Sequence, residues 1–165
     1  MTDAHPQELS ILAKLVIAIC VVLFIGGLIW HGATLKTFER FWDNLVDRPD
    51  GPMRFRFVLQ PLMAIIAAVR DGLRDARTGR PPYLATMLGS RQERIGLLNE
   101  GLNATARIIL LGVVMDVIYQ ALVLKTFYPN EALVVALALA FVPYLILRGL
   151  VLRFARARAT ARPSG

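Results

Sequence analysis

One apolar run of the chain carries polar residues that would share a face of a helix. Within 108–124, Tyr119 and Gln120 follow Asp116 by three and four residues, and Gly112 precedes it by four. If this run crosses a membrane, an ionised Asp116 near its middle costs roughly 2.5–3.5 kcal/mol, so the carboxyl should face protein or water and be easily protonated. Such an acid could carry a proton, bind a cation or hydrogen-bond a neighbouring span.

The next apolar run offers a face that could pack against the first. Small residues recur there at every fourth position and are followed by larger polar ones: Ala132, Ala136, Ala140, Tyr144 and Arg148. Small residues let helix backbones approach closely in a membrane. A tight antiparallel hairpin closed at 125–131, a segment with a Pro and an Asn, would place Asp116 level with Ala140. The predicted helix-packing residues are Gly112, Ala132, Ala136 and Ala140.

These positions predict a polar clasp between the two runs. Pro143 has no N–H to donate to the carbonyl of Leu139, which leaves an acceptor near the expected level of Asp116. We expect a protonated Asp116 to donate to that carbonyl or to Tyr144. Two other roles stay open for Asp116: a proton or cation path, and a contact between subunits. The predicted intramembrane polar cluster is Asp116, Tyr119, Gln120 and Tyr144.

The elements that must position these residues are long apolar helices. About 20 helical residues cross a hydrocarbon core of about 30 Å. Three segments meet this length, at about 11–33, 105–124 and 132–152. The residues before the first segment include two acids and no Lys or Arg, so we expect an uncleaved anchor and not a signal peptide.

A fourth apolar segment, 57–69, is short for a span and fits a re-entrant or interfacial helix. If it does not cross, 17 of the 19 Lys and Arg residues lie on one side of the membrane; if it crosses, the division is 13 to 6. Because Lys and Arg accumulate on the cytoplasmic side, we favour three crossings, with the N-terminus outside and the C-terminus cytoplasmic. A fourth spanning helix is the alternative.

The remaining segments are predicted to face water. Apolar residues recur at spacings of three and four in 35–48, which indicates an amphipathic helix lying on the bilayer or packed on the spans. Amphipathic cytoplasmic helices are expected in 70–103 and a basic tail in 153–165. The basic residues expected to contact anionic lipid head groups are Arg153, Arg156, Arg158 and Arg162. The predicted fold is therefore all-α, a single membrane domain over 1–165 built as a helical bundle.

Composition supports a membrane protein and narrows its chemistry. The chain is 56% hydrophobic, 19% charged and carries a net charge of +7. This is too apolar for a soluble domain, and the basic residues lie near span boundaries, so we expect lipid and not nucleic acid as their counter-charge. With a single cysteine, Cys20, and two histidines, we expect neither disulfides nor a metal or other cofactor.

From Phe55 onward the sequence resembles a bacterial family of small, uncharacterised integral membrane proteins. The residues that carry the resemblance are Arg56-Phe57-x-Leu59-Gln60-Pro61, Asp75-Ala76-Arg77-x-Gly79-Arg80-Pro81, Asp116-Val117-Ile118-Tyr119-Gln120, Tyr128-Pro129, Pro143-Tyr144 and Arg148-Gly149. The resemblance covers about two-thirds of the chain. It implies a location in the bacterial inner membrane and brings no activity or site residues with it.

These observations predict a non-enzymatic protein of the inner membrane, an accessory or assembly component that forms a homo-oligomer or joins a larger complex. The alternative is a subunit of a small proton- or cation-coupled transporter or channel that uses Asp116.

Overall fold

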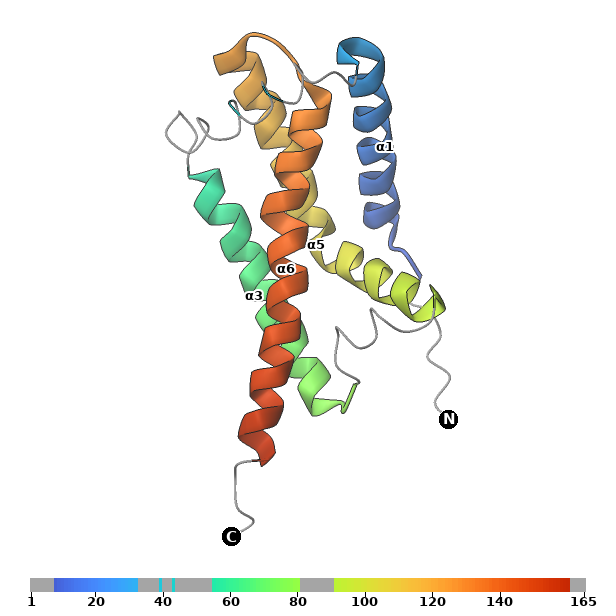
Figure 1. Ribbon diagram of the computed structural model, residues 1–165, viewed down its shortest axis with the longest axis vertical. Helices are drawn as coiled ribbons and strands as arrows, with labels where there is room; N and C mark the ends of the chain where they lie inside the picture. The colour runs from blue at the N-terminus through green and yellow to red at the C-terminus, as the bar shows by residue number, and fades with distance from the viewer. Residues whose placement is uncertain (1–7, 33–38, 40–42, 44–54, 81–90, 161–165) are drawn as a thin grey trace.

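The chain folds into long helices that lie side by side. The structure, a computed structural model, describes residues 8–32, 39, 43, 55–80 and 91–160. Its elements, labelled in Figure 1, are α1 (Ile11–His31), α3 (Arg56–Arg77), α5 (Arg91–Tyr119), which continues as the π-helical turn η2 (Gln120–Leu124), and α6 (Pro129–Thr160). The described part of the chain contains no strand, as predicted for an all-α fold.

Three helices are long and apolar enough to cross a membrane. They are Ile11–Trp30, Arg91–Leu124 and Pro129–Ala159. Two of them contain the predicted spans 105–124 and 132–152, and the first covers 11–30 of the predicted span 11–33, so the prediction of a multi-pass membrane protein with three such helices is confirmed.

Local chemistry explains where these helices begin and end. The Ser10 hydroxyl caps α1 by accepting a hydrogen bond from the Ala13 N–H, and Gly32, at φ 63°, ends the same helix in a conformation that favours glycine. Pro129 occupies the first position of α6, where its missing N–H costs nothing. Lys125, at φ 54°, turns the chain out of η2 into the hairpin before α6.

The helices alternate in direction along the chain, as the alternative with a fourth spanning helix requires. In Figure 1, α1 and α5 both run from the lower part of the molecule to the top, whereas α3 and α6 run downward. At the lower end the Ser10 N–H donates to Asn103 Oδ1 (2.8 Å), and at the upper end a Cβ on Gly27 would collide with the Asn130 side chain. We call the end that holds the η2–α6 turn the hairpin end, and the opposite end, where α6 finishes, the terminal end.

These helix directions fit the alternative arrangement, with a fourth spanning helix, and not the favoured three-crossing one. The three-crossing arrangement placed everything from His31 to Arg107 on one side, but α1 ends at the hairpin end and α5 begins at the terminal end. The chain must return between them, and α3 makes the described part of that return. The start of α1 consequently lies toward the same end of the bundle as the end of α6.

Several predicted segments also merge. Residues 57–69 and the first part of 70–103 form the single helix α3, residues 91–103 are continuous with the span in α5, and the tail remains helical to Thr160. The expected amphipathic helix at 35–48 lies outside the described residues apart from Glu39 and Asp43, as do 81–90 and 161–165.

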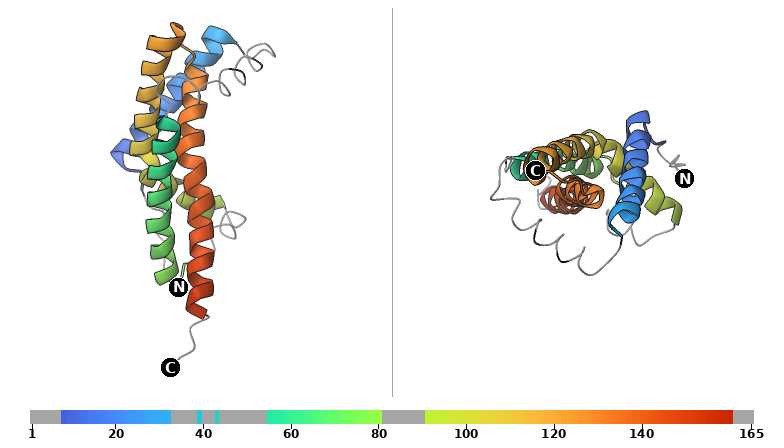
Figure 2. Two further views of the ribbon diagram at one scale, coloured as in Figure 1. Left: turned by 90° about the vertical axis from the view of Figure 1, so that its left-hand side faces the viewer. Right: turned by 90° about the horizontal axis from the view of Figure 1, so that it is seen from above.

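Small residues set the spacing of the bundle. Seen along its length, α3, α5 and α6 form one group, and α1 lies to one side against α5 and α6 (Figure 2). A Cβ on Gly112 of α5 would lie 3.2 Å from Ala136 Cβ of α6, and one on Gly72 of α3 would lie 2.9 Å from the Arg148 carbonyl oxygen. These close approaches bring polar side chains of all three helices within reach of each other.

Candidate functional site

Helix α3 presents one continuous buried stripe to α5 and α6. Its members recur at every fourth position, except the last, which follows after three: Arg56, Gln60, Ala64, Ala68, Gly72 and Asp75. Residues at this spacing lie on one face of a helix. The residues in the middle of the stripe are small and those at its two ends are polar. Helix α3 therefore contributes to one polar group near Arg56 and to another near Asp75.

The first group, which we call the Arg56 cluster, consists of Arg56, Gln60, Asp116 and Gln120. Arg56 Nη2 lies 2.6 Å from Asp116 Oδ1, and the two side chains are 2% and 0% exposed. The second carboxylate oxygen of Asp116 accepts a hydrogen bond from Gln120 Nε2 (2.5 Å). A cation and a neutral donor therefore engage both carboxylate oxygens of Asp116, in place of the expected Tyr144 or Leu139 partner.

Gln120 also ties the end of α5 to the start of α6. Its Nε2 donates to the Tyr128 carbonyl (3.1 Å), and its Oε1 accepts from the Tyr128 N–H. The π-helical turn begins at Gln120, and such turns change the direction of side chains within a helix. The hairpin is thus closed by a side-chain amide that is bonded at the same time to Asp116.

Aromatic rings cover the guanidinium of Arg56. Its Cζ lies 5.1 Å from the centre of the Phe57 ring and 4.9 Å from that of Tyr119, distances typical of cation–π contacts. Arg56 Nε and Nη1 have no hydrogen-bond acceptor among the described residues, and the same holds for Gln60 Oε1. Gln60 Nε2 makes a long hydrogen bond to the Ile108 carbonyl (3.4 Å).

The second group, the Arg148 cluster, lies toward the terminal end and consists of Asp71, Asp75, Glu100, Tyr144 and Arg148. Arg148 donates from Nε to Asp75 Oδ2 (2.7 Å), and its Nη2 pairs with the same oxygen (2.7 Å) and with Glu100 Oε2 (3.0 Å). Its Nη1 donates to the Tyr144 hydroxyl (2.9 Å), which in turn donates to Asp71 Oδ2 (2.7 Å). One guanidinium from α6 therefore joins α3 to α5.

A more exposed arginine closes the outer side of the Arg148 cluster. Arg80 Nη1 contacts both oxygens of Glu100 (2.9 and 3.1 Å) and lies 3.5 Å from Asp75 Oδ1. The Arg80 side chain is 51% exposed, compared with 1% for Arg148. The two arginines thus share two acids, one from inside the bundle and one from its surface.

The structure divides the predicted polar cluster. Asp116, Tyr119 and Gln120 come together around Arg56, but Tyr144 belongs to the Arg148 cluster. The expected bond from Asp116 to Tyr144 or to the Leu139 carbonyl is therefore corrected to an ion pair with Arg56 of α3.

The correction follows from the register of the hairpin. Gly112 packs against Ala136, and Gln120 bonds to Tyr128. Asp116 lies midway between Gly112 and Gln120, so it is level with Ala132, which lies midway between Tyr128 and Ala136. The predicted level was Ala140, two turns further along α6. The predicted register assumed a loop over 125–131. The structure instead has Gln120 bonded directly to the Tyr128 backbone across the turn.

The predicted packing residues lie where helices meet. Ala132, Ala136 and Ala140 are each 0% exposed, and Gly112 is buried against Ala136 and Gln60. The predicted head-group residues are separate from both clusters. Arg153 and Arg158 are exposed on the last turns of α6, Arg156 is half-buried there, and Arg162 lies outside the described residues.

Sequence reasoning missed the partners of these groups. Arg56, Gln60 and Asp75 were named as part of a family resemblance, and Asp71, Asp75 and Glu100 lie in the segment 70–103 that was predicted to face water. The four-residue spacing from Arg56 through Ala64 to Gly72 was a detectable signal, because it marks a small and polar face on a short apolar helix.

The arrangement is suited to holding helices together. Each buried arginine contacts acids from other helices, and among the described residues no group of three or more His, Cys, Asp or Glu could hold a metal ion. Comparison with protein-family models, curated proteins and solved structures finds no match to this chain. The resemblance to a bacterial membrane family stays a prediction, and functional inference rests on the two clusters.

Proposed function

We propose that this chain is a non-enzymatic subunit of the bacterial inner membrane that acts in the assembly or architecture of a membrane complex, as a homo-oligomer or with other proteins. The observation that carries the proposal is the burial of Asp116 and the pairing of both its carboxylate oxygens. It is fully buried, and its two oxygens are engaged by Arg56 and Gln120. An acid that carries protons or binds substrate cations must exchange partners, whereas one paired in this way fixes a helix in place.

The surface of α1 supports a role in association. Only 17% of the most apolar stretch of α1 is buried within the protein. Its outward residues include Phe24 (52% exposed), Ile29 (82%) and Trp30 (78%). Lipid alone can cover such a face, but a further transmembrane helix packed there would bury it as α3, α5 and α6 bury each other.

The distribution of charge supports a cytoplasmic location for both ends of the described chain. With 57–69 as a fourth span, 13 of the 19 Lys and Arg residues in the sequence fall on the side of the terminal end. Since cytoplasmic segments carry the excess of these residues, we place the terminal end in the cytoplasm and the hairpin end in the periplasm.

The alternative, a proton- or cation-coupled transporter or channel subunit that uses Asp116, is favoured by one observation. Arg56 Nε and Nη1 and Gln60 Oε1 have no hydrogen-bond partner among the described residues, although all three atoms are buried. Water bound there would give Asp116 a route for proton exchange.

One experiment separates the two functions. The full chain, affinity-tagged and extracted in mild detergent, is analysed by mass spectrometry for stoichiometric partners and for oligomers, and the same preparation is reconstituted for pH-driven flux. The proposal predicts a defined complex and a flux equal to that of protein-free liposomes. A monomer that supports flux, with the flux abolished in Asp116→Asn, would establish the transport alternative instead.

A further inference from the structure

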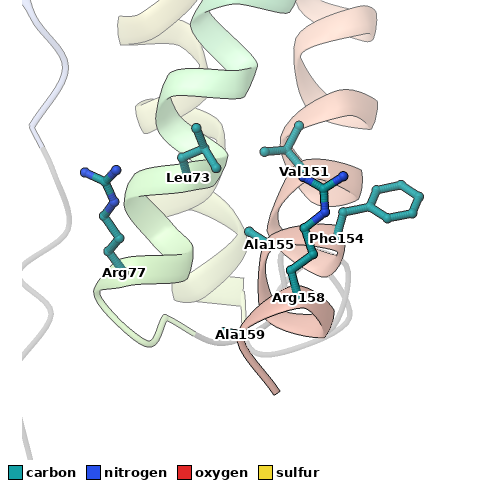
Figure 3. Close-up of a pocket in the computed structure, with 7 residues that line it drawn as sticks. All are labelled: Leu73, Arg77, Val151, Phe154, Ala155, Arg158 and Ala159. Carbon is teal, nitrogen blue, oxygen red and sulfur yellow. The ribbon is translucent and has the colours of Figure 1, made fainter. Parts of the chain in front are cut away.

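A groove opens between the last turns of α3 and α6, outside both charge clusters. The two helices run in the same direction and reach the terminal end together (Figures 1 and 2). The groove has a volume of about 880 Å³. It is lined by two residues of α3 and five of α6: Leu73, Arg77, Val151, Phe154, Ala155, Arg158 and Ala159 (Figure 3).

The walls of the groove are apolar apart from two arginines. Leu73 is 41% and Phe154 66% exposed, so their side chains leave apolar surface uncovered at this end of the bundle. Arg77 extends from α3 and Arg158 from α6, and both point back toward the hairpin end, with their guanidinium groups on opposite sides of the groove near the level of Leu73 and Val151 (Figure 3).

Both guanidinium groups are available to a ligand. Neither Arg77 nor Arg158 has an ion-pair or side-chain hydrogen-bond partner among the described residues, unlike Arg80 and Arg148 nearby. The lining contains no acidic residue. An occupant of this groove is therefore expected to carry negative charge at one end and an apolar chain at the other.

The groove lies where the apolar sequence of α6 gives way to basic sequence. The apolar helix Pro129–Ala159 ends beside it, and Val151 lies one turn beyond Arg148, so the groove spans the change from apolar to basic sequence. Arg side chains at such a boundary attract anionic phosphates on the cytoplasmic face. We propose that the groove binds one anionic phospholipid, with its head group between Arg77 and Arg158 and an acyl chain running past Leu73 and Val151 toward the hairpin end.

The test measures lipid binding to the full chain in detergent micelles by native mass spectrometry, with phosphatidylglycerol as the anionic probe and phosphatidylcholine as the zwitterionic one. Each arginine near a membrane surface is worth about fivefold in lipid affinity, so R77A/R158A should bind phosphatidylglycerol about 30-fold more weakly. The matched control is R91A/R94A, which removes the same charge from exposed positions at the start of α5 and should bind as wild type does.

A second variant tests the apolar half of the site. Ala155→Phe fills the groove and leaves both arginines in place, and it should also weaken phosphatidylglycerol binding, whereas added glycerol 3-phosphate should not compete. Equal losses in the two double variants, equal binding of the two lipids, or competition by glycerol 3-phosphate would overturn the proposal. Loss of a dimer in Ala155→Phe with lipid binding unchanged would also overturn it, by assigning the groove to a second copy of the chain.

Discussion

At the scale of single residues, Arg56 and Asp116 depend on each other. Each is a charge that the interior of a membrane protein tolerates only when compensated, and the pair is 2% and 0% exposed. In such pairs the loss of one partner leaves an uncompensated charge, which is costly, whereas the replacement of both by apolar groups of similar volume is often neutral. The pair therefore fixes the position of α3 more than it adds to stability.

Arg148 illustrates why the type of cation matters. Three of its nitrogens contact separate groups on Asp75, Glu100 and Tyr144. The planar guanidinium presents these donors in a fixed fork, which the single ammonium of lysine cannot reproduce. Arginine and lysine carry the same charge, so a comparison of Arg148 with lysine at the same position isolates the contribution of hydrogen-bond geometry.

We predict that Arg148→Lys lowers the free energy of unfolding by about 1.5–3 kcal/mol, because buried hydrogen bonds to carboxylates are lost. Arg80→Lys is the control. Arg80 contacts two of the same acids from a side chain that is 51% exposed, so its substitution should change the free energy of unfolding by no more than about 0.5 kcal/mol. The measurement is SDS- or heat-induced unfolding in detergent micelles. Equal effects at the two positions would contradict a buried role for Arg148.

At the scale of helices, α1, α5 and α6 could be predicted from the sequence because uninterrupted apolar runs are sufficient evidence for spans. Helix α3 could not, because only 57–69 is apolar and the helix continues to Arg77. Its polar ends are stabilised by Asp116 of α5 and Arg148 of α6, partners more than 50 residues away. Hydropathy averages over neighbours in sequence and does not register such pairs.

The contact between α3 and α6 is tested at Gly72. A Cβ there would lie 2.9 Å from the Arg148 carbonyl oxygen and 2.9 Å from Val151 Cβ, and the carbonyl belongs to a helix backbone that cannot move easily. We predict that Gly72→Ala destabilises the protein by about 1–3 kcal/mol through overpacking. The readout is the unfolding midpoint in detergent.

Gly96 of α5 provides a matched control for this substitution. No atom lies within 4 Å of a Cβ built on Gly96. Since alanine favours helix over glycine by up to about 1 kcal/mol, Gly96→Ala should leave stability unchanged or raise it. If Gly72→Ala also raises stability, α3 and α6 do not approach as closely as described.

At the scale of the whole molecule, the direction of α1 determines the topology. The count of Lys and Arg favoured three crossings, because that arrangement places 17 of these 19 residues on one side of the membrane. The contacts of Ser10 with Asn103 and of Gly27 with Asn130 instead set α1 parallel to α5. With 57–69 counted as a fourth span, 13 of the 19 Lys and Arg residues fall on the side of the terminal end, so we propose that this end is cytoplasmic.

Cysteine labelling in cells tests this topology. In a Cys20→Ser background, Glu8→Cys and Thr126→Cys each introduce one thiol at an exposed position, at the terminal and hairpin ends respectively. A membrane-impermeant maleimide should label position 126 in intact cells and position 8 only after the membrane is permeabilised. Labelling of both positions from the same side would contradict the parallel arrangement of α1 and α5.

The most direct test of the structural role of the buried charges is a double-mutant cycle on Arg56 and Asp116. Unfolding of the purified full chain in detergent is measured for wild type, Asp116→Leu, Arg56→Met and the double variant. We predict that each single variant loses about 3–5 kcal/mol, because it leaves one buried charge unpaired, and that the double variant recovers most of that loss. Single variants as stable as wild type, or a double variant that loses the sum of the two, would show that this pair does not hold α3 in the bundle.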